Sequence, residues 1–149
     1  MKKKSSILIF DAGDVNIWVM AYAFLKSFDP YSDFFPAANY PQEKIAAEVL
    51  EVLKESMLEP ANDSLISLND FSDNSFEFIF ITGAANPSTI TSLSRFTAKI
   101  IELTPINIVN TKEHETNCLD SYREMRDEIK NETFKFYRDY LRKSNRNNK

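Results

Sequence analysis

The sequence has one cysteine, Cys118, and one histidine, His114. A single thiol can form neither a disulfide within the chain nor a dithiol redox pair. A lone histidine, with no second histidine and no cysteine beside it, gives little support for a zinc site. We therefore expect no disulfide framework, no metal centre and no other cofactor.

Long hydrophobic runs are also missing. No stretch approaches the roughly 20 apolar residues that cross a bilayer. The basic start at residues 2–4 leads only into Ile7–Phe10, which is shorter than the about 7 to 15 apolar residues of a signal-peptide core. The net charge of −4 gives no support for a nucleic-acid partner. We expect a cytoplasmic protein that binds neither membranes nor nucleic acid.

Apolar and aromatic residues, in contrast, are plentiful. The chain of 149 residues is 43% hydrophobic and has twelve phenylalanines and six tyrosines. This length and composition suit one domain with a single substantial core. We expect residues 1–149 to form one domain, with residues 142–149 as a frayed, mildly basic tail.

The first 26 residues predict a strand, a tight loop and a helix. Ser6–Phe10 is apolar without polar alternation, as in a strand buried on both faces. Asp11-Ala12-Gly13-Asp14 interrupts it, and Ile17–Lys26 then follows a helical pattern. A loop that leads from a strand into a helix N-terminus is the usual setting of an anion-binding site, because the first N–H groups of a helix lack partners.

The rest of the chain continues to alternate between strands and helices. A second strand is expected at Asp33–Ala38, and a helix from Pro41 to about Glu55. The next expected elements are a short ordered connection at Ser67–Phe71, a third strand at Phe76–Thr82 and a helix near Ser88–Phe96. A fourth strand fits either Lys99–Leu103 or Ile106–Val109.

A long last helix completes the pattern. Thr116 or Asn117 would cap it, and one face would carry Tyr122, Met125, Ile129, Phe136 and Tyr140. Strands that alternate with helices predict an α/β fold. We expect a three-layer α/β/α arrangement with a four-stranded parallel sheet.

The segment Ile7–Lys26 resembles the opening strand, phosphate loop and first helix of the low-molecular-weight phosphotyrosine phosphatase and arsenate reductase family. In that family the loop reads Cys-Thr-Gly-Asn-Ser-Cys-Arg-Ser and is followed by Met-Ala-Glu and an apolar pair. The residues of this chain that fall in step are Gly13, Met20, Ala21, Phe24 and Leu25.

Weaker similarity continues in the same order along the chain. It covers Phe34–Ala38, Ser67–Phe71 with Phe76–Thr82, and Tyr122–Ile129, which is similar to the Arg-Asp-Glu-Ile turn of the family's last helix. The resemblance implies the phosphotyrosine phosphatase I-like, Rossmann-like fold. Most of the matched residues are core positions, so they bear on fold more than on chemistry.

Catalysis in that family rests on a cysteine thiolate, an arginine that clamps the oxyanion and an aspartic acid that protonates the leaving group. The resemblance places Asp11 at the cysteine position, Ile17 at the arginine position and Asn110 near the acid position. It therefore implies a degenerate member without catalytic residues. Asp11, Gly13, Asp14 and Asn16 would form a degenerate binding loop.

Asp11 has two interpretations. Its carboxylate can accept N–H bonds from the loop and from the start of the helix and so fill the place of a bound anion. Alternatively, it can act as a nucleophile or Mg²⁺ ligand, since Ile9-Phe10-Asp11-Ala12-Gly13-Asp14 also resembles the first motif of haloacid dehalogenase-type phosphatases. That enzyme class needs further acidic ligands, and residues 74–119 contain no aspartate.

Three hypotheses about function follow. The first is a catalytically inactive relative that acts as a binding or interaction module. The second is an Mg²⁺-dependent phosphatase with Asp11 as nucleophile, and the third is the arsenate reductase or tyrosine phosphatase activity that the family resemblance implies. Aromatic residues at Phe134, Phe136, Tyr137 and Tyr140 surround more than one helix face, so a homodimer or a protein partner is also expected.

Overall fold

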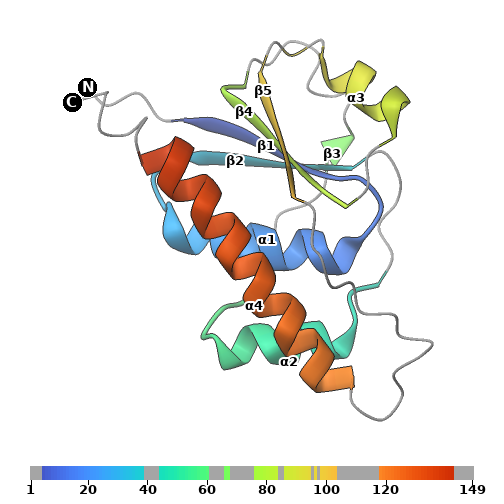
Figure 1. The fold of residues 1–149 in the computed structure, drawn as a ribbon, viewed down its shortest axis with the longest axis vertical. Coiled ribbons are helices and arrows are strands. Elements are labelled where there is room, and N and C mark those ends of the chain that lie inside the picture. Colours follow the sequence, from blue (N-terminus) through green and yellow to red (C-terminus); the bar gives the residue numbers. More distant parts are fainter. Residues whose placement is uncertain are drawn as a thin grey trace.

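The computed structural model describes residues 5–38, 44–60, 66–67, 76–83, 86–94, 96, 98–103 and 118–142. They form a parallel sheet with helices on both of its faces (Figure 1). The strands are β1 (Ser6–Asp11), β2 (Asp33–Ala38), β3 (Ile66–Ser67), β4 (Phe78–Thr82) and β5 (Lys99–Leu103). The helices are α1 (Val15–Phe28), α2 (Ala47–Glu55), α3 (Pro87–Ser94) and α4 (Cys118–Phe136), which continues into a π-helical turn at Tyr137–Leu141.

The strand order is β3-β2-β1-β4-β5, and every neighbouring pair is parallel. The central strand, β1, lies between β2 and β4, with Ile7 beside both Phe34 and Phe78. Its side chains are buried on both faces of the sheet, which explains why the sequence lacks polar alternation there. The expected α/β architecture with four parallel strands is confirmed, and the two-residue strand β3 adds an edge where an ordered connection was expected.

Two apolar cores lie on opposite faces of the sheet. The larger core packs α1, α2 and α4 against one face, and the smaller packs α3 against the other (Figure 1). Helix α1 is enclosed almost all round, because it lies between the sheet and α4. This enclosure fixes where α1 begins, and so fixes the loop that precedes it.

Several predicted boundaries hold and others move. The fourth strand occupies Lys99–Leu103, the first of the two predicted places. Helix α1 extends past the predicted Ile17–Lys26 at both ends. Helix α2 begins at Ala47 rather than at Pro41: the backbone of residues 44–46 is not helical, and Pro41 lies outside the described residues.

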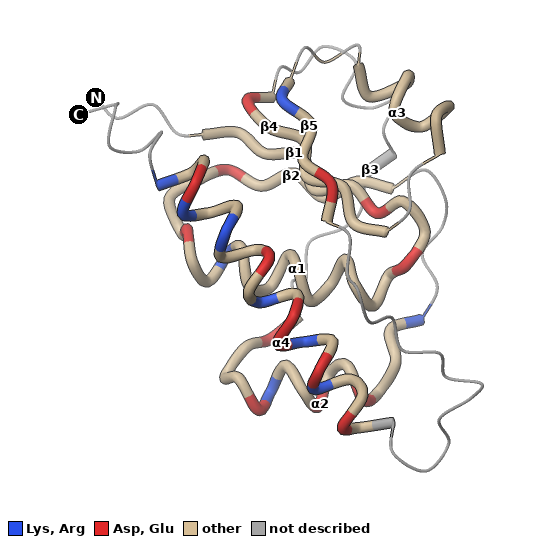
Figure 2. The backbone as a smooth tube through the Cα atoms, viewed as in Figure 1, with Lys and Arg blue, Asp and Glu red and all other residues tan. Residues whose placement is uncertain are grey.

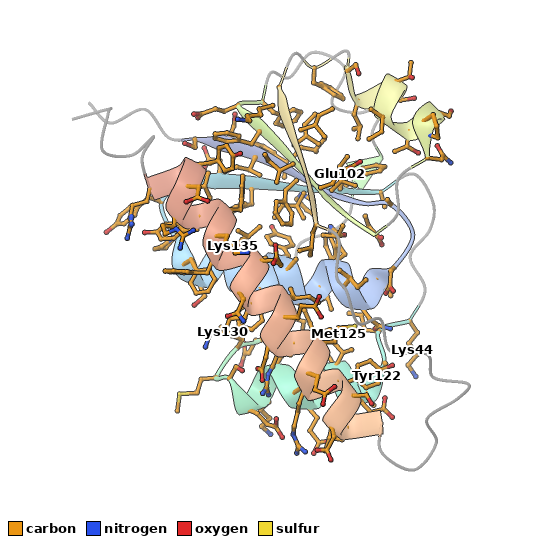
Figure 3. The ribbon with its side chains drawn as sticks, in the orientation of Figure 1. Lys44, Glu102, Tyr122, Met125, Lys130 and Lys135 are labelled. Atoms are coloured by element: carbon orange, nitrogen blue, oxygen red, sulfur yellow. The ribbon has the colours of Figure 1, made fainter. Side chains whose placement is uncertain are left out.

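The last helix presents the expected apolar face. Tyr122, Met125, Ile129 and Phe136 are buried, and Figure 3 labels the first two on α4. The predicted caps Thr116 and Asn117 lie outside the described residues. Among the helices that the structure describes, none is long and apolar enough to cross a membrane.

Candidate functional site

The loop at residues 12–14 leaves the carboxyl end of β1, where the chain's order in the sheet reverses. β2 and β3 follow on one side of β1, and β4 and β5 follow on the other. Open α/β sheets bind their ligands at such a reversal. The loop continues the strand for one residue, because the Ala12 amide donates to the Thr82 carbonyl over 2.8 Å. This is the position at which the sequence predicted an anion-binding loop.

The Asp11 side chain turns back into this loop. Its Oδ1 atom accepts hydrogen bonds from the Gly13 and Asp14 amides, each over 2.8 Å, and the residue is 6% exposed. Backbone amides of this kind hold a phosphate oxygen in an anion cradle. The expected N–H bonds from the loop to Asp11 are present, whereas the expected bonds from the start of the helix go to Asp14 instead.

Asp14 does the same for the start of α1. Its Oδ1 atom accepts from the Asn16 amide over 3.0 Å and from the Ile17 amide over 3.3 Å, so Asp14 is the N-cap of the helix. The sequence analysis placed Asp14 in the binding loop but missed its capping role. An aspartate directly before an apolar helical run was the available signal.

These bonds leave little of the loop for an external anion. Of the six amides from Ala12 to Ile17, five donate to Thr82, Asp11 or Asp14. The loop also has two carboxylates and no basic side chain, as Figure 2 shows along the turn from β1 into α1. Both features oppose the binding of a dianion.

The only two glycines of the chain lie in this region. Gly13 has a φ of 143° and Gly83, which follows β4, has a φ of 87°. A Cβ atom on Gly83 would lie 3.6 Å from the Gly13 and Asp14 nitrogens, so the two loops touch. Positive φ values strain other residues, and glycine therefore allows both turns to pack against each other.

Asn16 connects the loop to a distant segment. Its Oδ1 atom accepts a hydrogen bond from the Ala46 amide over 3.0 Å, which ties the first turn of α1 to the residue before α2. The sequence analysis assigned Asn16 to the binding loop. In the structure its side-chain oxygen is used to hold two helix starts together.

Ile17 belongs to the larger apolar core. It is 1% exposed and packs among the residues between the sheet and the helices. An isoleucine at this position therefore contributes to the core of the protein. Its side chain carries no charge with which to clamp an anion.

The remaining predicted site residues are not placed together with the loop. Asn110 and His114 lie outside the described residues, and Cys118 is the first residue of α4. Within the described part of the chain, no group of three His, Cys, Asp or Glu residues could hold a metal ion. The Mg²⁺ ligands that the haloacid dehalogenase alternative requires are therefore not found around Asp11 in those residues.

A small cleft of about 120 Å³ opens elsewhere, between β5 and the end of α4. Its floor is apolar and includes Phe80 and Phe136, and its rim includes Lys135 and Asp139. Figure 3 labels Lys135 on α4 and Glu102 on β5. The lining includes no residue of the loop at 12–14, so the cleft is not part of the candidate site.

Comparison with known proteins shows the fold. The sequence matches no protein-family model and no curated protein. Among solved structures, it is similar to a mutant of YwlE from Bacillus subtilis, with a TM-score of 0.67 and 16% identity over 91% of this chain and 97% of that one. The tyrosine phosphatase AmsI from Erwinia amylovora gives a TM-score of 0.66 and 14% identity over 91% and 93% of the two chains.

Arsenate reductases have the same architecture. The enzyme from Archaeoglobus fulgidus has a TM-score of 0.60 and 16% identity over 87% of this chain and 97% of that one. These likenesses extend over nearly the full length of the solved chains. The backbone of this protein therefore has the fold of tyrosine phosphatases and arsenate reductases.

Proposed function

We propose that this chain is a catalytically inactive domain with a phosphatase-like fold that acts as a binding or interaction module. The observation that carries the proposal is the Asp11 carboxylate, which accepts the Gly13 and Asp14 amides at the place where related folds hold a phosphate oxygen. The loop therefore contains its own anion.

The chemistry of the loop supports the same conclusion. A carboxylate that accepts two amide hydrogen bonds on one oxygen is a poor replacement for a thiolate nucleophile, because these bonds stabilise its negative charge and lower its nucleophilicity. Ile17, which the family resemblance aligns with the anion-clamping arginine, is buried in the core. Asn110, aligned near the general acid, is an uncharged residue that cannot donate a proton as a carboxylic acid does.

A second candidate is the enzymatic activity of the structural neighbours, which are tyrosine phosphatases and arsenate reductases. Their fold favours it, since the loop leads from a central strand into a helix N-terminus in this chain too. The two candidates differ in what they require of the loop. Turnover needs a nucleophile there, and a binding module does not.

Activity measurements separate the candidates. We expect no hydrolysis of para-nitrophenyl phosphate and no thiol-dependent reduction of arsenate above the buffer rate, at any pH between about 5 and 8. Asp11→Ala and Cys118→Ser serve as matched variants, because they remove the loop carboxylate and the only thiol. A rate in the unaltered protein that either substitution abolishes would overturn the proposal.

A further inference from the structure

Six exposed charges along one side of α4 and its last turn are ordered by sign, whereas two further exposed charges, Lys130 and Asp139, lie beside them and do not follow this order. Asp120, Glu124 and Asp127 are exposed along the first half, and Lys135, Arg138 and Arg142 along the second. Asn131 and Phe134 lie between the two groups, and Phe134 is 40% exposed. We name these eight residues the α4 stripe. Figure 2 shows both signs of charge along the helix as a whole, so the segregation is specific to the stripe.

The spacing of the stripe keeps it on one side of the helix. Six of its members recur at alternating intervals of four and three residues, the repeat by which one helix packs along another: Asp120, Glu124, Asp127, Asn131, Phe134 and Arg138. Lys135 follows Phe134 directly and lies four residues after Asn131. The next interval of three would reach Leu141, which is fully buried. The wider π-helical turn at Tyr137–Leu141 adds one residue to the repeat and brings Arg142 to the exposed side instead.

The helix dipole does not account for this order of charges. It favours acidic residues in the first turn and basic residues in the last, and its effect fades beyond those turns. Glu124 and Asp127 lie deeper in the helix, beyond its first turn. A second helix with the opposite order of charge would account for them.

The ion pairs of these charges within the chain are local. Asp120 pairs with Arg123 over 2.7 Å, and Asp127 pairs with Arg126, whose side chain is 14% exposed, over 3.0 Å. Arg138 pairs with Asp139 over 3.0 Å and Lys135 with Glu132 over 3.5 Å, both between exposed or half-exposed side chains. Such pairs exchange readily with other partners. Among the described residues, the side chains of Glu124 and Arg142 make no ion pair.

We propose that the α4 stripe is a self-association surface, which a second copy of this chain covers with its own stripe running antiparallel. With Asn131 at the centre, Glu124 then faces Arg138 of the second copy, and Asp127 faces Lys135 of the second copy. Asp120 likewise faces Arg142 of the second copy. Two-fold symmetry repeats each contact, and Phe134 of each copy supplies apolar area near the centre.

Charge complementarity selects this arrangement. A parallel pairing would set acid against acid and base against base, which is unfavourable. Because the contacts are mainly ionic and Phe134 is the one exposed large apolar residue in the stripe, the dimer is weak and sensitive to salt. The proposal concerns a different surface from the loop at 12–14 and holds whether or not that loop is catalytic.

Sedimentation of the full chain at about 0.05 M and about 0.5 M NaCl tests the proposal. We expect a monomer–dimer equilibrium at low salt that shifts toward monomer at high salt. Glu124→Lys should weaken association about tenfold or more, since symmetry converts two attractive contacts into repulsive ones. Glu51→Lys, which makes the same charge change on α2, is the matched control and should leave association unchanged.

A charge swap gives a result that loss of folding cannot imitate. Arg138→Glu alone should weaken association as Glu124→Lys does, whereas the double variant, or an equimolar mixture of the two single variants, should recover it. A monomeric protein at low salt would overturn the proposal. Undiminished association of Glu124→Lys, or no recovery in the double variant and the mixture, would overturn it as well.

Discussion

At the scale of single residues, two aspartates have the same role. The carboxylate of each accepts hydrogen bonds from backbone amides of the loop that follows it. Asp11 does this after β1, and Asp29 does it after α1, where it accepts the Tyr31 and Ser32 amides over 3.1 and 3.2 Å and the Ser32 hydroxyl over 2.6 Å. Asp29 has no link to the candidate site. The hydrogen-bond pattern of Asp11 is therefore one that the same chain repeats in a turn outside the candidate site.

Ile17 provides a quantitative test at the same scale. Because it is buried in the larger core, Ile17→Arg should lower the free energy of unfolding by about 3 kcal/mol, through loss of apolar packing and burial of a charge. Ile17→Val, the conservative control, should lower it by about 1 kcal/mol. Urea denaturation measures both. A neutral effect of Ile17→Arg would mean that the side chain reaches the loop mouth, which would contradict its assignment to the core.

Local sequence signals predicted some residue roles and missed others. That Asp11 would accept loop amides followed from an acid placed between a strand and a helix, a short-range pattern. The use of Asn16 depends on the Ala46 amide, 30 residues away in the chain, and no local pattern shows such a bond. The contact of Gly83 with the Gly13 loop is likewise a product of strand order, which places the end of β4 beside the end of β1.

At the scale of elements, the end of α2 is fastened to α4 by a cluster of charges. Glu55 accepts hydrogen bonds from Arg123 and Arg126, with its shortest contact to each at 2.7 Å. Arg126 also donates to the Val52 carbonyl over 3.1 Å, in the last turns of α2. Helix α2 thus has one tie at its start, through Asn16, and another at its end.

The pH dependence of stability reports on this cluster. The hydrogen bond from Arg123, followed by that from Arg126, lowers the pKa of Glu55 from 4.5 to about 2. A carboxylate whose pKa is depressed by folding stabilises the protein fully above its unfolded pKa and loses that effect as pH falls through its folded pKa. The contribution of Glu55 is therefore complete above about pH 4.5 and disappears toward about pH 2.

Urea midpoints between about pH 2 and 6 make this measurable. Glu55→Gln should unfold at lower urea than the unaltered protein at pH 6, and the two midpoints should converge as the pH approaches 2. Glu59→Gln removes a nearby exposed carboxylate that makes no ion pair among the described residues, and it serves as the control. A gap that stays constant across the pH range would show that the ionised carboxylate is not what fastens α2.

The elements were predictable where burial alone determines them. β1 and β4 are apolar runs between helices, so their place in a parallel sheet followed from the sequence. The start of α2 did not, because proline favours a first helical turn but cannot determine where tertiary contacts begin. The π-helical turn at Tyr137–Leu141 escaped prediction, because a repeat of apolar residues indicates a helix but not a single wider turn at its end.

At the scale of the whole molecule, the fold depends on core residues, whereas the chemistry depends on the side chains of the loop. Solved tyrosine phosphatases and arsenate reductases share this backbone at 9% to 16% identity. Such a likeness is sustained by core positions on both faces of the sheet, and these can persist after a loop has changed its side chains. The sequence could therefore predict the architecture from apolar patterns, whereas the state of the loop required the hydrogen bonds themselves.

The most direct test of the occupied loop is a phosphate titration followed through the amide NMR signals of Gly13 and Asp14. For the unaltered protein we expect no saturable shift of these signals up to about 10 mM phosphate, because the Asp11 carboxylate holds both N–H groups. In Asp11→Ala, where that acceptor is gone, the same two signals should shift with added phosphate. Saturable shifts of Gly13 and Asp14 in the unaltered protein at millimolar phosphate would contradict the account.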